Sequence, residues 1–396
     1  MIPAEFLLFG AVLIGVAVSH RHAMAIAMSG AMAIAVYKVL FSSFPTGTGL
    51  SGFVGHLGHE WAVLVNLLLL LLGFALLARQ FEDSEIPAML PRWLPDDWPG
   101  AFVLLVLVFG LSSFLDNIAA AMIGGAIAHT VFRGTVHIAY LAGIVAAANA
   151  GGAGSVIGDT TTTMMWIAGV APADVLRAFL PAGIALVVCG IPAARVQQRH
   201  SPIQQGPPRG VQIDWIRAAI VLAILGAAVA VNVVVNTRFS EDAGRFPFLG
   251  AAVMGSMLLT APIRRPQWSL LGPALTGSLF LLSLVLCASM MPVESLPAPS
   301  WQTSFGLGFL SAVFDNIPLT ALALKQGGYD WGMLAYAVGF GGSMTWFGSS
   351  AGVALTGMYP EARSVGLWLR HGWWVIVAYV AGFFVLLVTL GFRPGR

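Results

Sequence analysis

Polar side chains interrupt an otherwise apolar stretch at residues 112–163. Asp116, Asn117 and Asn149 precede a glycine cluster, and Asp159 follows it directly before four consecutive threonines. A carboxylate at membrane depth costs about 2.5–3.5 kcal/mol on insertion scales. Such a group is retained mainly for ion coordination, for proton transfer or for pairing with a buried cation, so we expect a functional site in this stretch.

A weaker copy of the pattern lies late in the chain. LSSFLDNI at 111–118 aligns with LSAVFDNI at 310–317, and GGAGSVIGDTT at 151–161 aligns with GGSMTWFGSSA at 341–351. The second pair shares two adjacent glycines, a hydroxyl four residues beyond the first glycine, and a later glycine. The two motifs occur in the same order in both halves, which indicates an internal repeat.

The composition places these motifs in a membrane protein. The 396 residues are 58% hydrophobic and 9% charged, with a mean hydropathy of +0.86, whereas a soluble domain carries about 25% charged residues. We expect an α-helical protein that crosses the lipid bilayer in roughly ten spans. The formal net charge of +2 gives no reason to expect a nucleic-acid partner. Cys189 and Cys287 lie in apolar runs and predict no disulfide framework.

Apolar runs occur in the same order in both halves of the chain. Each half shows three runs, a hairpin around an Asp-Asn pair, a run interrupted by glycines, and a final run. In the first half they lie at about 3–18, 22–41, 60–79, 99–128, 136–170 and 174–195. In the second half they lie at about 214–235, 246–262, 269–291, 303–324, 331–357 and 372–391. The polar, proline-containing segment 196–213 links the first repeat, 1–195, to the second, 214–396.

The positions of the arginines predict how the halves are oriented. If the hairpins at 99–128 and 303–324 are re-entrant, most loop arginines fall on one side of the membrane. The opposing loop 43–59 has neither Lys nor Arg, whereas Arg238 and Arg245 violate the pattern. The halves then have opposite topologies, with a cytoplasmic linker and both termini outside. Inverted repeats of this kind occur in secondary transporters, whose site lies near the midplane.

The sequence therefore predicts an all-α polytopic membrane protein built as an inverted repeat. Each half is expected to contain about five spans plus one re-entrant hairpin, with broken helices at the midplane. Glycines allow a helix to unwind so that backbone carbonyls can approach an ion. Unwound backbone at membrane depth is tolerated only where it lines a cavity or is buried in protein.

The residue types in the motifs favour a small, hard cation. Carbonyls, amides, hydroxyls and carboxylates are hard oxygen ligands, although a freed helix N-terminus alone would favour an anion. The carboxylates favour the cation, because they would repel an anion and no lysine in the motifs offsets their charge. The only lysines, Lys38 and Lys325, lie outside the motifs. Candidate ion-binding residues are Asp116, Asn117, Asn149, Gly152, Ser155, Asp159, Thr160, Thr161, Asp315, Asn316, Gly342, Ser343, Thr345, Ser349 and Ser350. Asp116, Asp159 and Asp315 are the candidate Na⁺ ligands among them.

Asp159 is the first choice for the titrating group. Its counterpart in the second half is Ser349, and this difference in charge suggests where a proton and a cation compete for one carboxylate. Asp116 and Asp315 occur in both hairpins, so capping the hairpin turn is an alternative role for them. The glycines can instead serve close helix packing. The threonines can bond their own helix backbone, and Thr160 and Thr161 are favoured as ligands over the two that follow.

The residues of these motifs resemble a known family. LDNIAAAMIGG followed by NAGGAGSVIGDTTTTMMWI is similar to the NhaD-type sodium/proton antiporters of the ion transporter superfamily. That superfamily also holds citrate-transporter-like, dicarboxylate/sodium and arsenite permease families. Related dicarboxylate carriers have Ser-Asn-Thr at the hairpin tips and a prolyl stretch after the glycine motif. Here the tips carry Asp-Asn, and Asp159-Thr160-Thr161 replaces the prolyl stretch, which argues against a dicarboxylate substrate.

The resemblance implies a division of labour within each repeat. It implies a scaffold domain, usually dimeric, and a transport domain of hairpins and broken helices that moves in an elevator-like manner. It also implies a multi-pass protein of the bacterial inner membrane that exchanges Na⁺ and H⁺ and needs no cofactor. The scaffold spans are then 1–98 and 214–300, and the transport elements are 99–195 and 301–396.

Three functions remain to be compared. Cation (Na⁺ or Li⁺)/proton antiport is favoured over the alternative, a proton- or sodium-coupled carrier of an organic acid such as citrate or an oxyanion such as arsenite. An intramembrane aspartyl protease is disfavoured, because Leu115 precedes Asp116 where that class has Tyr, and Val156 stands where its motif has the first glycine. The chain lacks the GxxxxGK[ST] nucleotide-binding loop, so we do not expect a primary pump or another enzyme.

Overall fold

The chain folds almost entirely into α-helices. The computed structural model describes residues 3–19, 22–89, 94–203, 212–239 and 245–395. Within these ranges the only sheet is one two-stranded hairpin. The all-α, polytopic prediction is therefore confirmed. Residues 204–211 of the predicted linker lie outside the described part of the chain.

The N-terminal elements are three helices and the short hairpin. They are α1 (Ala4–Val18), α2 (Ala23–Phe41), β1 (Ser43–Phe44), β2 (Gly47–Thr48) and α3 (Gly49–Glu82). The prediction of a loop at 43–59 was wrong for its second part, because α3 begins at Gly49. The chain turns within the hairpin instead, where Gly47 has a φ of +138° that favours glycine. The residues after this turn contain no proline and continue directly into the apolar span.

The remaining elements of the first half surround the predicted hairpin and break. They are α4 (Ile86–Met89), α5 (Asp97–Ser112), α6 (Asn117–Val131), α7 (Ile138–Ala153), α8 (Thr160–Ile167), α9 (Pro172–Leu176) and α10 (Phe179–His200). The glycine cluster lies in the gap between α7 and α8 and at the end of α7, as the sequence predicts.

The second half repeats this order of elements. They are α11 (Trp215–Arg238), α12 (Phe248–Thr260), η3 (Trp268–Leu270), α13 (Leu271–Ser289), η4 (Val293–Ser295), α14 (Trp301–Ser311), α15 (Asn316–Gln326), α16 (Trp331–Gly341), η5 (Gly342–Met344), α17 (Ser350–Met358), η6 (Pro360–Ala362), α18 (Val365–Gly372) and α19 (Trp374–Leu390). Here the break lies between α16 and α17, around the second glycine cluster.

Helix length separates full spans from shorter elements. Five described segments are long and apolar enough to cross a bilayer, namely Ala23–Phe41, Gly49–Glu82, Pro172–His200, Trp215–Val235 and Trp268–Ser289. The pair α18 and α19, bent by 59°, adds a sixth if it counts as one span. The other apolar helices have only 10–17 residues, fewer than the roughly 20 that a span needs. Both hairpin helices of the first half and α7 belong to this short class.

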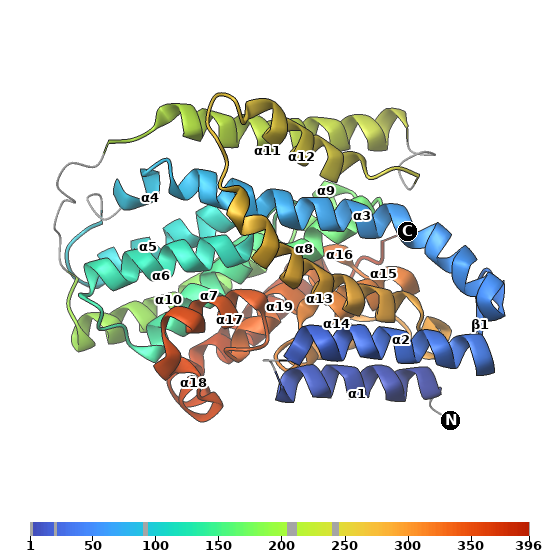
Figure 1. Cartoon of the computed structure of the whole chain (residues 1–396). Helices are drawn as coiled ribbons and strands as arrows, with labels where there is room; N and C mark the ends of the chain where they lie inside the picture. The colour runs from blue at the N-terminus through green and yellow to red at the C-terminus, as the bar shows by residue number, and fades with distance from the viewer. Residues whose placement is uncertain (1–2, 20–21, 90–93, 204–211, 240–244, 396) are drawn as a thin grey trace.

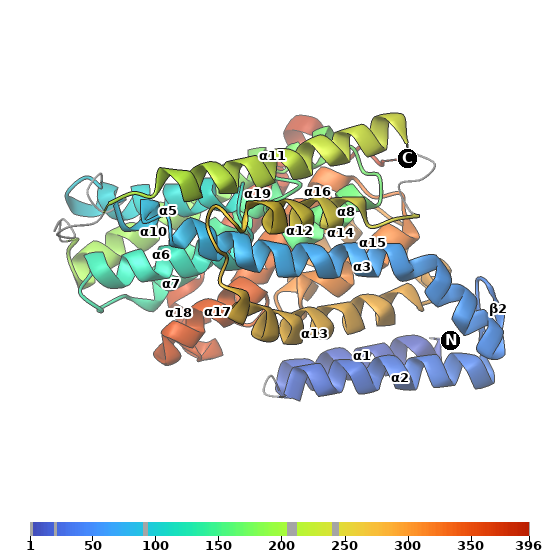
Figure 2. The same cartoon turned by 45° about the horizontal axis from the view of Figure 1, so that its top comes forward.

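The helices form three apolar clusters. The largest joins α5, α6, α7 and α10 to α16 and α19. A second joins α1 and α2 to α13, and a third joins α3 to α11 and α12. Figures 1 and 2 show α11 and α12 beside α3, and α1 and α2 as a pair on the other side of α13. Both chain termini lie at one end of the molecule, and the start of α11 lies toward the opposite end (Figure 1).

The two halves make matching contacts between hairpin and broken helix. Ser112 Oγ donates to Ala148 O over 2.5 Å, and Ser311 Oγ donates to Val338 O over 2.7 Å. A Cβ atom on Gly151 would lie 2.0 Å from a backbone oxygen of the preceding hairpin helix, and one on Gly341 would lie 2.4 Å from the corresponding oxygen. These close approaches require glycine. The contacts support an internal repeat, whereas the opposite orientation of its halves stays a prediction.

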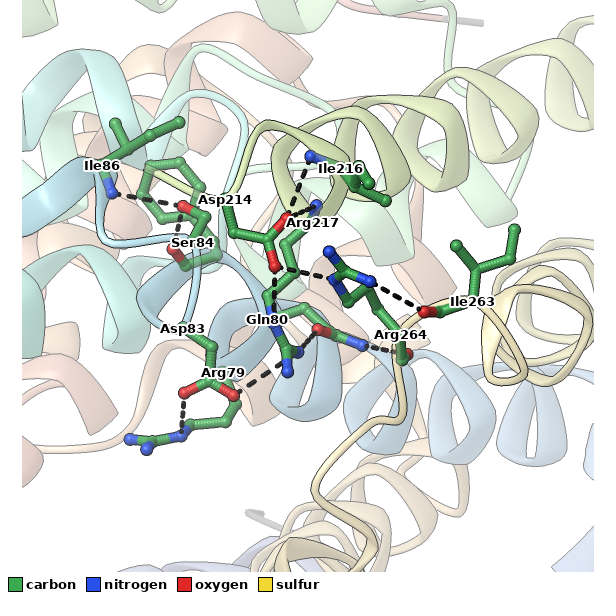
Figure 3. A network of polar contacts seen from close by, with 11 residues as sticks. Arg79, Gln80, Asp83, Ser84, Ile86, Asp214, Ile216, Arg217, Ile263 and Arg264 are labelled. Atoms are coloured by element: carbon green, nitrogen blue, oxygen red, sulfur yellow. Dashed lines mark hydrogen bonds and ion pairs between the residues drawn. The ribbon is translucent and has the colours of Figure 1, made fainter. Parts of the chain in front are cut away.

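A polar network joins the end of α3, the start of α11 and the segment after α12 (Figure 3). Asp214 precedes α11, accepts two backbone N–H groups of its first turn, and pairs with Arg264 over 2.7 Å. Arg217 bonds Gln80 and lies 3.6 Å from Asp83. This network fixes the start of α11 against the ends of its two neighbours.

Candidate functional site

The Asp-Asn pairs stand at the tips of the two hairpins. Asp116 is the N-cap residue of α6, and Asp315 is the N-cap residue of α15, with nearly identical backbone angles. Asp315 Oδ1 accepts from Ile317 N over 3.0 Å, and its Oδ2 accepts from Ser350 Oγ over 3.0 Å. The capping role considered for Asp315 is therefore present in the structure, and it links the hairpin tip to the start of α17.

Asp159 and Ser349 occupy corresponding positions after the two breaks. Asp159 is the N-cap residue of α8, where its Oδ1 accepts from Thr161 N over 3.0 Å. Ser349 is the N-cap residue of α17, where its Oγ accepts from Gly352 N over 3.3 Å. Both residues have extended backbone. The positive end of a helix dipole favours a carboxylate at such a position, but only the first half supplies one.

Amide groups from both hairpins converge on the other oxygen of Asp159. Asn117 Nδ2 donates to Asp159 Oδ2 over 3.1 Å, and Asn316 Nδ2 approaches the same oxygen at 3.5 Å. All three side chains are almost fully buried, with Asp159 only 2% exposed. Among the described residues, no Lys or Arg forms an ion pair with Asp159. The carboxylate is thus held by neutral donors, so its negative charge has no partner of opposite sign.

Asn149 links this carboxylate site to the second break. Its Oδ1 accepts from Asn117 Nδ2 over 3.1 Å. Its Nδ2 donates to Ser343 Oγ over 2.9 Å and to Ser349 Oγ over 3.0 Å. Asn149 has no exposed surface. The chain therefore forms one continuous buried polar network from the first hairpin to the second broken helix.

Other predicted residues lie around this network without joining it. Ser155 Oγ accepts from Ile157 N, and Thr345 Oγ1 donates to Ala312 O, so both hydroxyls bond nearby backbone. Gly152 lies close to the carbonyl of Gly158, and Gly342 lies close to that of Gly348. Thr160, the first residue of α8, is only half-buried.

The last three threonines of the run in α8 divide into two kinds. Thr162 Oγ1 donates to Ser155 O, and Thr163 Oγ1 donates to Val156 O. Both hydroxyls therefore satisfy backbone carbonyls in the unwound segment between α7 and α8. Thr161 Oγ1 is buried and has no hydrogen-bond partner in the part of the chain that the structure describes. A buried hydroxyl without a partner is costly, and this one belongs to the residue whose N–H binds Asp159.

The three candidate carboxylates occupy separate positions. No group of three or more His, Cys, Asp or Glu side chains among the described residues could hold one metal ion. Asp116, Asp159 and Asp315 therefore form no such three-carboxylate group, and each is the N-cap residue of a different helix. A cavity of 330 Å³ reaches Asp315 and Ser350 from between α1, α13 and α17. Its other lining residues are almost all apolar.

Some side-chain contacts were not predicted from the sequence. Ser112 and Ser311 lie inside the aligned motifs, and their shared position before the Asp-Asn pairs was a sign that could have identified them. Arg177 lies 3.1 Å from the fully buried Asp330, which also accepts from the backbone N–H groups of Met333 and Arg393. This ion pair joins the end of α9 to the start of α16. Nothing in the sequence indicates it, because the two residues belong to different motif-free segments.

Comparisons with known proteins all point to antiporters. The chain is 30% identical over 295 residues to "Sodium/proton antiporter 1" of Arabidopsis thaliana, which covers 65% of this chain and 50% of that protein. It is 26% identical over 396 residues to "Na(+)/H(+) antiporter NhaD" of Vibrio parahaemolyticus, covering 85% and 90%. For the protein of the same name from Halomonas elongata, the identity is 26% over 386 residues, covering 82% and 75%.

The extent of these similarities differs between relatives. The chain spans about half the length of the plant relative and nine tenths of the Vibrio relative. No family model matches the chain.

Proposed function

The chain belongs with the NhaD-type sodium/proton antiporters at the level of the family, and on that premise we propose that it exchanges Na⁺ or Li⁺ for protons across the membrane. The exchange is secondary active transport, so the two ions are the substrates and no resident cofactor takes part. The names of several relatives support this reaction.

The buried carboxylate of Asp159 is the single observation that carries the proposal. It accepts hydrogen bonds from neutral amides and from one backbone N–H, and no described cation pairs with it. A buried negative charge is tolerated only when something neutralises it. A proton or a small cation can do so, but the two exclude each other at one carboxylate, and this exclusion couples their movements.

Three further groups complete the proposed site. Asn117 and Asn149 supply amide oxygens, and Asn117 also bonds the carboxylate. The unpartnered hydroxyl of Thr161 supplies an additional oxygen. Oxygen donors of this kind suit a small hard cation. Asp315 is proposed to shape its hairpin tip, because one of its oxygens caps α15 and the other bonds Ser350 at the start of α17.

The proposal extends to the arrangement of the chain in the membrane. The halves 1–195 and 214–396 form an inverted repeat, the linker 196–213 is cytoplasmic, and the protein lies in the bacterial inner membrane as a homodimer. The scaffold spans stay in place while the transport elements move in an elevator-like manner. The gathering of both hairpins and both breaks into one buried network supports a transport unit that moves as one body.

An organic-acid or oxyanion carrier is the less favoured alternative. An anion at the network would meet the charge of Asp159, and the described network contains no Lys or Arg to offset it. The N-termini of α8 and α17 would attract an anion, but the side chains of Asp159 and Ser349 already accept from one first-turn N–H group of each helix.

Dequenching of a pH-sensitive dye in everted vesicles tests the proposal. Na⁺, Li⁺ and K⁺ are added separately to vesicles that contain the wild-type protein. Na⁺ or Li⁺ is expected to cause release of protons from the vesicles. Asp159→Asn should abolish the response. Asp174→Asn, a matched change in α9 outside the network, should retain it. No response to any cation over a wide pH range would overturn antiport and direct attention to uptake of carboxylates and oxyanions.

A further inference from the structure

A second polar region lies between the predicted scaffold spans and the transport elements. A cavity of 360 Å³ opens between α3, α8, α13 and α15. Its charged and titratable lining groups are His59, Glu60 and Lys325, and its walls include Met164 and Ala321. None of these residues belongs to the network around Asp159.

Two of the four helices connect this cavity to the carboxylate site. Helices α8 and α15 begin next to each other, where Asn316 Nδ2 lies 3.5 Å from Asp159 Oδ2. Met164 and Ala321 each lie five residues beyond these starting points, about 8 Å along a helix at 1.5 Å per residue. The same helix pair therefore holds the site at one end and lines the cavity one and a half turns later.

The lysine in the cavity wall is already bound to the scaffold. Lys325 Nζ donates to Ser289 O and Met291 O at the end of α13, and Lys38 Nζ donates to Met290 O between them. These are the only lysines of the chain. Cations at the C-terminus of a helix satisfy its last carbonyls and its dipole. The ammonium group of Lys325 is thus bound to carbonyls at the C-terminal end of α13.

Glu60 is left as the negative group of the cavity. It is half-buried in α3 and forms neither a hydrogen bond nor an ion pair with another described residue. It directly precedes the uncharged run 61–78 of that span. An ionisable residue at such a position is retained at a cost. A lone carboxylate at the mouth of a cavity with low-dielectric walls concentrates cations there.

We propose that this cavity is the route by which cations reach Asp159 from the membrane face that carries the chain termini, and that Glu60 attracts them into it. The inference rests on the proposed antiport. Figure 1 places α15 and the start of α3 toward the end of the molecule that carries both termini. The exposed side chains of His59 and Ala168 mark the outer opening.

Transport kinetics test the role of Glu60. Glu60→Gln is expected to raise the Na⁺ concentration for half-maximal exchange about fivefold while leaving the maximal rate unchanged, because it removes attraction but not the site. The effect should shrink when an inert salt is added. Glu294→Gln is the matched control, since this exposed carboxylate does not line the cavity. An unchanged half-maximal concentration in Glu60→Gln would overturn the role of Glu60.

Thiol labelling tests the route without any transport. Ala321→Cys, in a background with Cys189→Ala and Cys287→Ala, should react with a membrane-impermeant cationic reagent applied to the face of the termini. Glu60→Gln should slow this reaction several-fold but leave a neutral reagent unaffected. Ala147→Cys, at a fully buried position away from the cavity, should not react. An unreactive Ala321→Cys would overturn the route.

The two assays separate this inference from the proposed function. Exchange in the dye assay together with an unreactive Ala321→Cys would retain antiport and refute this route. The expected labelling pattern without any exchange would refute antiport and retain a cation-attracting cavity.

Discussion

The two broken helices of this chain have the same construction but differ at one position. Each break follows a pair of glycines, each hairpin serine bonds a carbonyl before the break, and each helix after the break starts at a capping side chain. That cap is Asp159 in the first half and Ser349 in the second. The packing is also reciprocal, because α8 contacts α15 and α17 contacts α6.

The difference shows what each part contributes. The repeated backbone places the start of a helix at two buried positions, and only one of the two capping side chains is a carboxylate. Asn149 then joins the two, since it bonds Ser349 directly and contacts Asp159 through Asn117. We infer that the second break holds the polar network in position, and that the first break binds the exchanged ions. The following predictions test this asymmetry.

Removing the charge difference should have the largest effect. Asp159→Ser makes the two caps alike, and we expect exchange to fall at least about 100-fold, because the group that holds the proton or cation is lost. The measurement is the initial rate of dye dequenching with Na⁺ in everted vesicles. Ser349→Ala serves as the control in the other half. An Asp159→Ser protein that keeps more than a tenth of the wild-type rate would contradict the asymmetry.

The two hairpin asparagines should differ in a graded way. Asn117 donates to Asp159 at 3.1 Å and Asn316 at 3.5 Å. A hydrogen bond to a charged group contributes about 1.5–3 kcal/mol, so Asn117→Ala should weaken Na⁺ affinity at least about tenfold. Asn316→Ala should weaken it less. Equal effects, measured as Na⁺ concentrations for half-maximal exchange, would show that the hairpins contribute alike.

The two serines that meet Asn149 should matter least for exchange. Ser343 and Ser349 both accept from Asn149 Nδ2, so either one alone leaves a partner for that amide. A neutral hydrogen bond contributes about 1 kcal/mol, which corresponds to about a fivefold change in affinity at most. The double variant should lose more than the sum of the two single effects. Strictly additive losses in the dye assay would argue against a shared partner.

A charged group far from both breaks should affect stability but not exchange. The hydrogen bond from Arg264 holds the pKa of Asp214 below its ordinary value. Because the folded pKa is lowered, this carboxylate stabilises the protein above its unfolded pKa of about 3.9 and loses that effect as the pH falls through the folded value.

Asp214→Asn keeps a capping side chain but removes the ion pair. Its melting temperature in detergent should therefore be lower than that of the wild type at neutral pH, and the difference should vanish in strong acid. Its exchange rate should equal that of the wild type. A stability difference that grows in acid would contradict this assignment.

The motifs allowed much of this arrangement to be predicted. Burying aspartates and amides in apolar runs costs free energy, so these residues indicated where polar contacts gather. The paired glycines indicated where the helices end. The sequence could not predict which hydroxyls face the network. Ser155 and Thr345 bond nearby backbone instead, because segments outside regular helices leave N–H and carbonyl groups that need partners: Ser155 Oγ accepts from Ile157 N, and Thr345 Oγ1 donates to Ala312 O.

Contacts between distant segments were beyond prediction. The bonds from Asn149 to Ser343 and Ser349 depend on how the halves pack, and no local pattern records that packing. The ion pair of Arg177 with Asp330 is similar in this respect. The early start of α3 was missed because hydropathy marks the apolar run and not the polar first turns of the same helix.

Equilibrium binding of Na⁺ with simultaneous measurement of proton release tests the central claim most directly. If Asp159 holds either ion, the purified protein should release about one proton for each Na⁺ bound, at pH values at which the sodium-free carboxylate is protonated. The apparent dissociation constant should then rise about tenfold for each pH unit of acidification, and Asp159→Asn should show neither effect. Sodium binding that releases no proton in the wild type, or proton release that persists in Asp159→Asn, would contradict a carboxylate shared by the two ions.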